Sequence, residues 1–153
     1  NLTNAEQGPL NDKGINCLRV FPGRGIRVWG ARTLSESPFW RYVNVQRLFL
    51  TVGRWIERNM AGVVFEPHGP RLWARIRREL TTYLEGLLRQ GDLKGRTAEE
   101  AFYIKCDAEL NTSEVQEAGM VITEIGLATV APAEFVVIRL IHGATGVRII
   151  GTS

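Results

Sequence analysis

Two stretches of periodic apolar residues constrain the fold of this chain most strongly. Between residues 40 and 60, and again after Pro70, apolar side chains recur at spacings of three and four, the period of a helix with one buried face. Pro70 is tolerated in a first helical turn, and Gly91 is a typical helix end. The apolar positions are Val45, Leu48, Phe49, Val52, Ile56 and Met60, then Leu72, Trp73, Ile76, Leu80, Tyr83, Leu84 and Leu87. The sequence therefore predicts two long amphipathic helices that share a core.

Short segments rich in β-branched residues surround these helices. Residues 15–34 predict two strands around the Gly-rich turn at Pro22-Gly23, and residues 1–14 predict at most a short helical turn. Further extended segments are expected at 63–67, 102–107, 120–125, 134–141 and 146–151, with a capped turn at 97–100, a helical turn at 113–118 and a break at Pro132. The expected fold is α+β: a small, largely antiparallel sheet with two long helices packed on it, plus an extended C-terminal arm strand.

Composition fits one globular domain with a single core. The chain has 153 residues, of which 44% are apolar and 23% charged, and its formal net charge is +3. No apolar run approaches the roughly 20 residues of a membrane span, and the N-terminus lacks the features of a signal peptide. The first residue is not Met, so we expect a piece of a longer protein.

Residues that could carry chemistry do not form a recognisable site, and we expect no catalytic, cofactor-binding or metal site. The glycines of residues 23–25 lack the Gly-Lys-Ser/Thr of a phosphate loop and predict a tight turn. His68 and His142 have no partner at metal-ligand spacing and are expected on the surface or in loops. Cys106 beside Asp107 leaves a hydrolase as an alternative, which needs a base from elsewhere in the fold.

The two cysteines, Cys17 and Cys106, are too few for a disulfide scaffold. Two buried thiols are the simpler interpretation, and one bridge between them stays an alternative.

A mostly basic strip follows one side of the second predicted helix. Its candidate docking residues are Arg71, Arg75, Arg78 and Arg89. The strip is either a solvated face diluted by acidic neighbours, a docking face for an acidic partner, or a nucleic-acid surface. No aromatic side chains interleave with the arginines, which disfavours nucleic acid.

The last strand is the most informative segment. Residues 143–146 form a flexible link to a short apolar strand whose members are Val147, Arg148, Ile149 and Ile150. An unpaired strand of this kind promotes aggregation, so it pairs either with its own sheet or with the sheet of a neighbour. Each buried β-branched side chain contributes about 1.5–3 kcal/mol, and each backbone hydrogen bond about 0.5–1.5 kcal/mol.

Several segments, in order, resemble the core of contractile tail sheath proteins. They are GIN (14–16), VFPGRGIRVWGARTL (20–34), WRYVNVQRL (40–48), VFEP (64–67), LWARIR (72–77), FYIKCD (102–107) and PAEFV (132–136). The family includes sheaths of phage tails, R-type tailocins and extracellular contractile injection systems. The resemblance implies a C-terminal core domain at 1–142 and an arm at 143–153 that adds a strand to a neighbouring subunit.

The resemblance further implies a structural protein that is not an enzyme and has no cofactor. Expected partners are other sheath subunits in stacked hexameric rings, an inner tube, and baseplate and tail terminator proteins, with no nucleic acid and no membrane span. The expected location is a virion tail or extracellular contractile particle, assembled in the bacterial cytoplasm. The alternative function is a basic module that binds nucleic acid or another acidic polymer.

Overall fold

The computed structural model describes residues 2–38, 40–130, 135–144 and 146–152. Backbone contacts divide the chain into two compact units, Asn1–Arg47 and Leu48–Ser153. The boundary predicted between residues 142 and 143 concerns an assembled particle and stays a prediction.

The N-terminal unit contains α1 (Asn4–Asp12) and an antiparallel hairpin of β1 (Cys17–Phe21) and β2 (Gly25–Trp29). The hairpin confirms the prediction for this segment. The prediction of at most one helical turn before it was wrong, because a reciprocal cap starts α1. The Thr3 hydroxyl accepts from the Glu6 N–H at 3.3 Å, and the Glu6 carboxylate accepts from the Thr3 N–H at 2.8 Å. This capping box offsets the poor helix formers Gly8 and Pro9.

Both long helices lie where periodicity predicts them, as α2 (Val43–Asn59) and α3 (Pro70–Gln90). Gly91 ends α3 with a φ of 84°, a conformation that costs glycine little. The rings of Trp55 and Tyr83 stack at 4.1 Å between centroids, which fixes α2 beside α3.

The extended segment predicted at 63–67 was wrong, because a 3-10 helix, η1 (Ala61–Phe65), lies there. The N–H of Met60 donates to the carbonyl of Ile56, and the N–H of Val63 donates to Met60, so the chain continues to turn beyond α2. This turn buries both Met60 and Val63. Their burial outweighs the strand preference of the valines.

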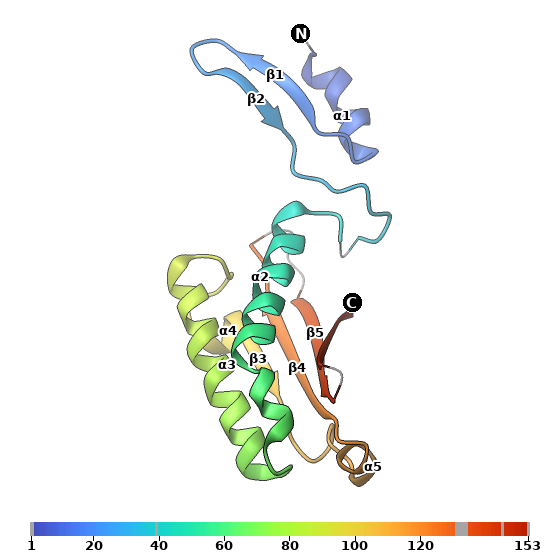
Figure 1. Ribbon diagram of the computed structural model, residues 1–153. Helices are drawn as coiled ribbons and strands as arrows, with labels where there is room; N and C mark the ends of the chain where they lie inside the picture. The colour runs from blue at the N-terminus through green and yellow to red at the C-terminus, as the bar shows by residue number, and fades with distance from the viewer. Residues whose placement is uncertain (1, 39, 131–134, 145, 153) are drawn as a thin grey trace. The chain divides into compact units, whose positions relative to one another are not determined.

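The second unit also contains one antiparallel sheet in the order β3-β4-β5-β6 (Figure 1). Its remaining elements are α4 (Ala98–Ala101), β3 (Phe102–Lys105), α5 (Ser113–Glu117), β4 (Val121–Ala128), β5 (Phe135–Gly143) and β6 (Gly146–Thr152). The α+β class is confirmed, including the antiparallel sheet with helices packed on it. The break expected at Pro132 lies outside the described residues.

Alternating side chains of the sheet form the core against the helices. Ile125, Leu127, Ile138 and Leu140 of the sheet are fully buried, as are Ile56, Ile76, Leu80 and Leu84 of the helices. Burial of each such side chain contributes about 1.5–3 kcal/mol, so this interface is the main source of stability. None of the helices in the described ranges is long and apolar enough to cross a membrane.

A buried asparagine fixes the connection between β3 and β4. The Asn111 amide donates to the carbonyls of Asp107 and Ile122 at 2.9 and 3.0 Å, and its oxygen accepts from the Ile122 N–H at 2.7 Å. Nearby, the Arg77 guanidinium on α3 donates to the carbonyl of Cys106. These side chains satisfy backbone groups that the ladder leaves unpaired.

Replacement of Asn111 by alanine is expected to lower the free energy of unfolding by about 2–4 kcal/mol, because the buried partners of its amide lose their hydrogen bonds. Asn59→Ala is the matched control: its amide also bonds a backbone carbonyl, that of Trp55, but in an exposed position. We expect it to change stability by less than about 0.5 kcal/mol. Urea unfolding of both variants measures the difference, and equal effects would contradict this role of Asn111.

Candidate functional site

The C-terminal strand β6 lies along β5 of the same chain. The register runs from Val137 opposite Thr152 to Gly143 opposite Gly146, and β6 forms one edge of the sheet (Figure 1). The arm predicted to extend away is thus a hairpin strand in the single chain. Its attachment to a neighbouring subunit stays a prediction, because the structure contains one copy.

The residues of β6 alternate between the two faces of the sheet. Val147 and Ile149 are partly buried, whereas Arg148 and Ile150 are exposed. Ile149 reaches α2: a Cβ atom built on Gly53 would lie 2.8 Å from its Cδ1 atom. The absence of a side chain at Gly53 therefore allows β6 to pack closely against α2 through Ile149. The apolar periodicity of the sequence does not reveal this role.

A polar cluster crosses the opposite face of the sheet. The Tyr103 hydroxyl of β3 donates to the Glu124 carboxylate of β4 at 3.1 Å, and Arg139 of β5 donates to the same carboxylate at 2.9 Å. The Arg139 guanidinium holds the pKa of Glu124 below its usual value. Because each strand contributes one member, the cluster ties β3, β4 and β5 together and leaves β6 outside.

His142 occupies an unexpected position. It is fully buried on β5, opposite Val121 of β4 and Val147 of β6, rather than on the surface or in a loop. Both ring nitrogens lack a hydrogen-bond partner in the described part of the chain. The signal was present in the sequence, since His142 is in phase with Ile138 and Leu140.

Among the arginines of the predicted docking strip, Arg75 differs from the others. It pairs with Glu66 and, at 2.7 Å, with Glu79. Arg71, Arg78 and Arg89 are exposed and make no ion pair with the described residues. All four lie on α3, but only these three have charge available for a partner.

The two cysteines are free and buried. Burial raises the pKa of the Cys106 thiol, which disfavours a nucleophilic thiolate. The groups that act on this thiol are those of Thr123, Arg77 and Asn111 and the charge of the neighbouring Asp107, whose Oδ1 atom accepts from the N–H groups of Glu109 and Leu110. This setting does not support the hydrolase alternative. Within the described ranges, no group of three His, Cys, Asp or Glu residues could hold a metal ion.

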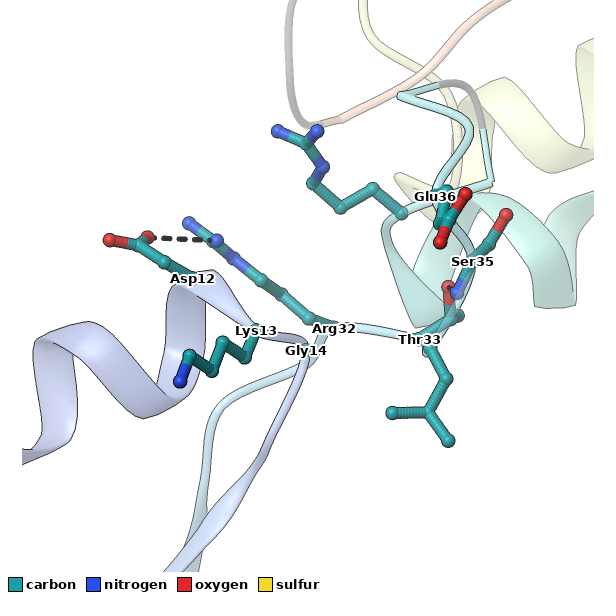
Figure 2. Close-up of a pocket in the computed structure, with 9 residues that line it drawn as sticks. Asp12, Lys13, Gly14, Arg32, Thr33, Ser35 and Glu36 are labelled. Atoms are coloured by element: carbon teal, nitrogen blue, oxygen red, sulfur yellow. Dashed lines mark hydrogen bonds and ion pairs between the residues drawn. The ribbon is translucent and has the colours of Figure 1, made fainter.

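A polar pocket of about 340 Å³ lies in the N-terminal unit (Figure 2). The Arg32 guanidinium in its wall pairs with Asp12 at 3.1 Å. The lining residues are Asp12, Lys13, Gly14, Arg32, Thr33, Leu34, Ser35, Glu36 and Arg41. Mixed charges and a paired arginine favour a solvated hollow over a ligand site.

The backbone contacts beside this pocket explain why Gly14, Asn16 and Gly30 occur in the segments that resemble sheath proteins. Asn16 donates to the carbonyl of Arg32 at 2.7 Å and accepts from its N–H at 2.9 Å. A Cβ atom on Gly30 would lie 2.5 Å from the Asn16 side chain, and one on Gly14 would lie 2.7 Å from the carbonyl of Thr33. Both glycines are therefore required for the close approach of two backbone segments.

The β1–β2 hairpin has one exposed apolar face. Leu18 lies opposite Val28, Val20 lies opposite Ile26, and all four side chains are more than half exposed. The other face is held by α1, where Gln7 donates to the carbonyl of Trp29 at 3.1 Å. An apolar face of this kind is typical of an interaction surface.

The comparisons with known families identify the chain. The family described as the phage tail sheath C-terminal domain matches residues 35–141. This chain belongs to that sheath family. No curated protein matches it.

Solved sheath structures agree with this assignment. The chain is 42% identical, with a TM-score of 0.78, to a chain of the PVC extracellular contractile injection system sheath complex in the contracted state. It is 40% identical to chains of the anti-feeding prophage (AFP) 6-fold symmetrised baseplate and of its contracted helical sheath, with TM-scores of 0.78 and 0.75. In each comparison the match covers 88% of this chain and 38% of the solved chain. The sheath domain thus spans well under half the length of these relatives.

The seat of β6 on α2 can be tested with two helical glycines. Gly86 of α3 has no neighbouring atom at its Cβ position, so Gly86→Ala is expected to stabilise the chain by about 0.5–1 kcal/mol. Gly53→Ala is expected to gain less, because its new methyl group meets Ile149.

Ile149→Val removes the Cδ1 atom, so Gly53→Ala should regain the full benefit in that background. Thermal unfolding of the double-mutant cycle measures this coupling. If Gly53→Ala has the same effect with Ile149 and with Val, then β6 does not rest on α2.

Proposed function

We propose that this sheath domain is part of a structural subunit that polymerises around an inner tube in stacked hexameric rings and contracts to drive that tube through a target envelope. The observation that supports this proposal most strongly is the 40–42% identity to chains from the contracted sheaths of two contractile particles. The subunit acts mechanically, so it is not an enzyme and needs no cofactor. Its partners are copies of itself, a tube, a baseplate and a tail terminator, and the particle is a phage tail or an extracellular injection device assembled in the bacterial cytoplasm.

Residues 143–153 act in this proposal as the arm that links neighbouring copies. The contacts between β5 and β6 do not depend on whether the strand comes from the same chain or from another copy. Exchange of the strand therefore preserves the β5–β6 hydrogen bonds and the contact of Ile149 with Gly53 of α2. Only the backbone between Gly143 and Gly146 takes a different direction. The hairpin is then the form of an isolated subunit, and the donated strand is the form in the sheath.

Cysteine crosslinking in assembled particles distinguishes the two forms. Ile141 and Arg148 are register partners, so Ile141→Cys with Arg148→Cys places two thiols across the β5–β6 ladder. Strand donation predicts a ladder of covalent oligomers on non-reducing electrophoresis after oxidation. If only monomers form, then each β6 pairs with β5 of its own chain, and the proposal that residues 143–153 link neighbouring copies is rejected. Each single-cysteine variant is the control.

A second test removes the arm. Deletion of residues 143–153 is expected to yield folded subunits that no longer form sheaths, as judged by circular dichroism and negative-stain microscopy. Normal sheaths from this variant would contradict the role of the arm. If the deletion variant does not fold, the crosslinking experiment decides.

The exposed arginines of α3 provide the proposed docking surface for an acidic face of the tube or of an adjacent subunit. Arg78→Glu with Arg89→Glu should weaken assembly, most strongly at low salt, because the interaction is electrostatic. Arg58→Glu on α2 is the matched control, since Arg58 is also exposed. Unchanged assembly and salt dependence would reject the surface. Salt-dependent retention of nucleic acid by the wild-type chain would favour the basic-module alternative instead.

A further inference from the structure

His142 lies where β6 must separate if the strand is exchanged. It faces Val121 on one side and Val147 of β6 on the other, and the helix η1 packs against both β5 and β6. The imidazole is fully buried, and neither nitrogen has a partner in the part of the chain that the structure describes. A proton added to this ring would create an unpaired buried charge, which a closed sheet strongly disfavours.

The surroundings of His142 supply no compensating charge. The helix η1 has no titratable residue, and Arg139 and Arg148 alternate onto the opposite face of the sheet. The charged residues of α2 and α5 are exposed; they are Arg47, Arg54, Glu57, Arg58, Glu114 and Glu117. His68 is a further titratable group at this end, and its Nε2 atom lies 2.8 Å from the carbonyl of Met120. Glu66, which follows η1, pairs with Arg75.

We propose that His142 is a pH-sensitive latch for β6, neutral while the strand is closed and protonated when it is open. The latch acts on the opening of the β5–β6 hairpin. A role for the latch in assembly rests on the proposed donation of β6 to a neighbouring subunit. Lower pH then favours the open subunit. A strand donated by a neighbour buries the ring again, so the latch controls the rate of exchange rather than the stability of the finished lattice.

The sign of the pH effect follows from the burial. Burial lowers the pKa of His142, and the nearby Val121 backbone opposes this shift to a smaller extent. An exposed histidine has a pKa near 6.5. Below about pH 6.5 the open form therefore binds a proton that the closed form excludes, and closure is fully favoured only above that value.

Hydrogen exchange of the β6 amides in the full chain measures this opening directly. After correction for intrinsic exchange, the opening constant of residues 147–150 should rise about tenfold between pH 7.5 and 5.5, which is the change expected for one linked proton. His142→Phe should abolish this rise, because phenylalanine does not titrate. His68→Gln, the matched control at the same end of the sheet, should retain it.

Two results would overturn the latch. One is an unchanged pH dependence in His142→Phe, and the other is an ordinary pKa for the His142 imidazole in NMR titration of the wild-type chain. The titration decides even if the variant fails to fold. Mixing of two isotope-labelled populations, read from crosslinks between them, tests strand donation separately. If the opening depends on pH but no such crosslinks form, then His142 controls the opening of β6, and a role for the latch in assembly is rejected.

Discussion

The pairing of β5 on both of its edges is the interaction on which the second unit depends. On one side β4 pairs with it over eight residues, and the Glu124–Arg139 ion pair crosses the ladder. On the other side β6 contributes backbone hydrogen bonds and two inward apolar side chains. Without β6, an apolar strand would present an open edge, which is a template for unwanted pairing. A chain that covers this edge with its own strand is protected from such pairing.

The strands of the sheet are unequally attached to one another. Tyr103, Glu124 and Arg139 connect β3 to β5, and Asn111 connects β4 to the loop before it. No comparable polar bond from β6 is present among the described residues. Within the second unit, the helices and strands β3, β4 and β5 are therefore suited to move as one body, whereas β6 is suited to move against it.

The sequence predicts the large elements well because their signals are strong. Two helices with continuous apolar stripes have no other way to bury them, and the strands follow from β-branched runs. The errors arise where a few contacts outweigh local preference. A capping box made α1 longer than Gly8 and Pro9 suggest, and the burial of Val63 drew a strand-like segment into a 3-10 turn. The burial of His142 was not predicted, because histidine is less often fully buried than apolar residues are. Its alternation with the buried residues Ile138 and Leu140 along the strand indicates the inward position. The residue pattern alone does not decide the partner of β6, because pairing with β5 of the same chain and pairing with β5 of another copy bury the same side chains.

The burial of the two thiols protects the fold from oxidation. Cys17 and Cys106 are unbridged and shielded from solvent, and Cys106 resists ionisation. Oxidants act on accessible thiolates, so neither sulfur offers them a ready target. The described fold therefore does not depend on a disulfide between these two cysteines, and both thiols are protected in reducing and in oxidising surroundings alike.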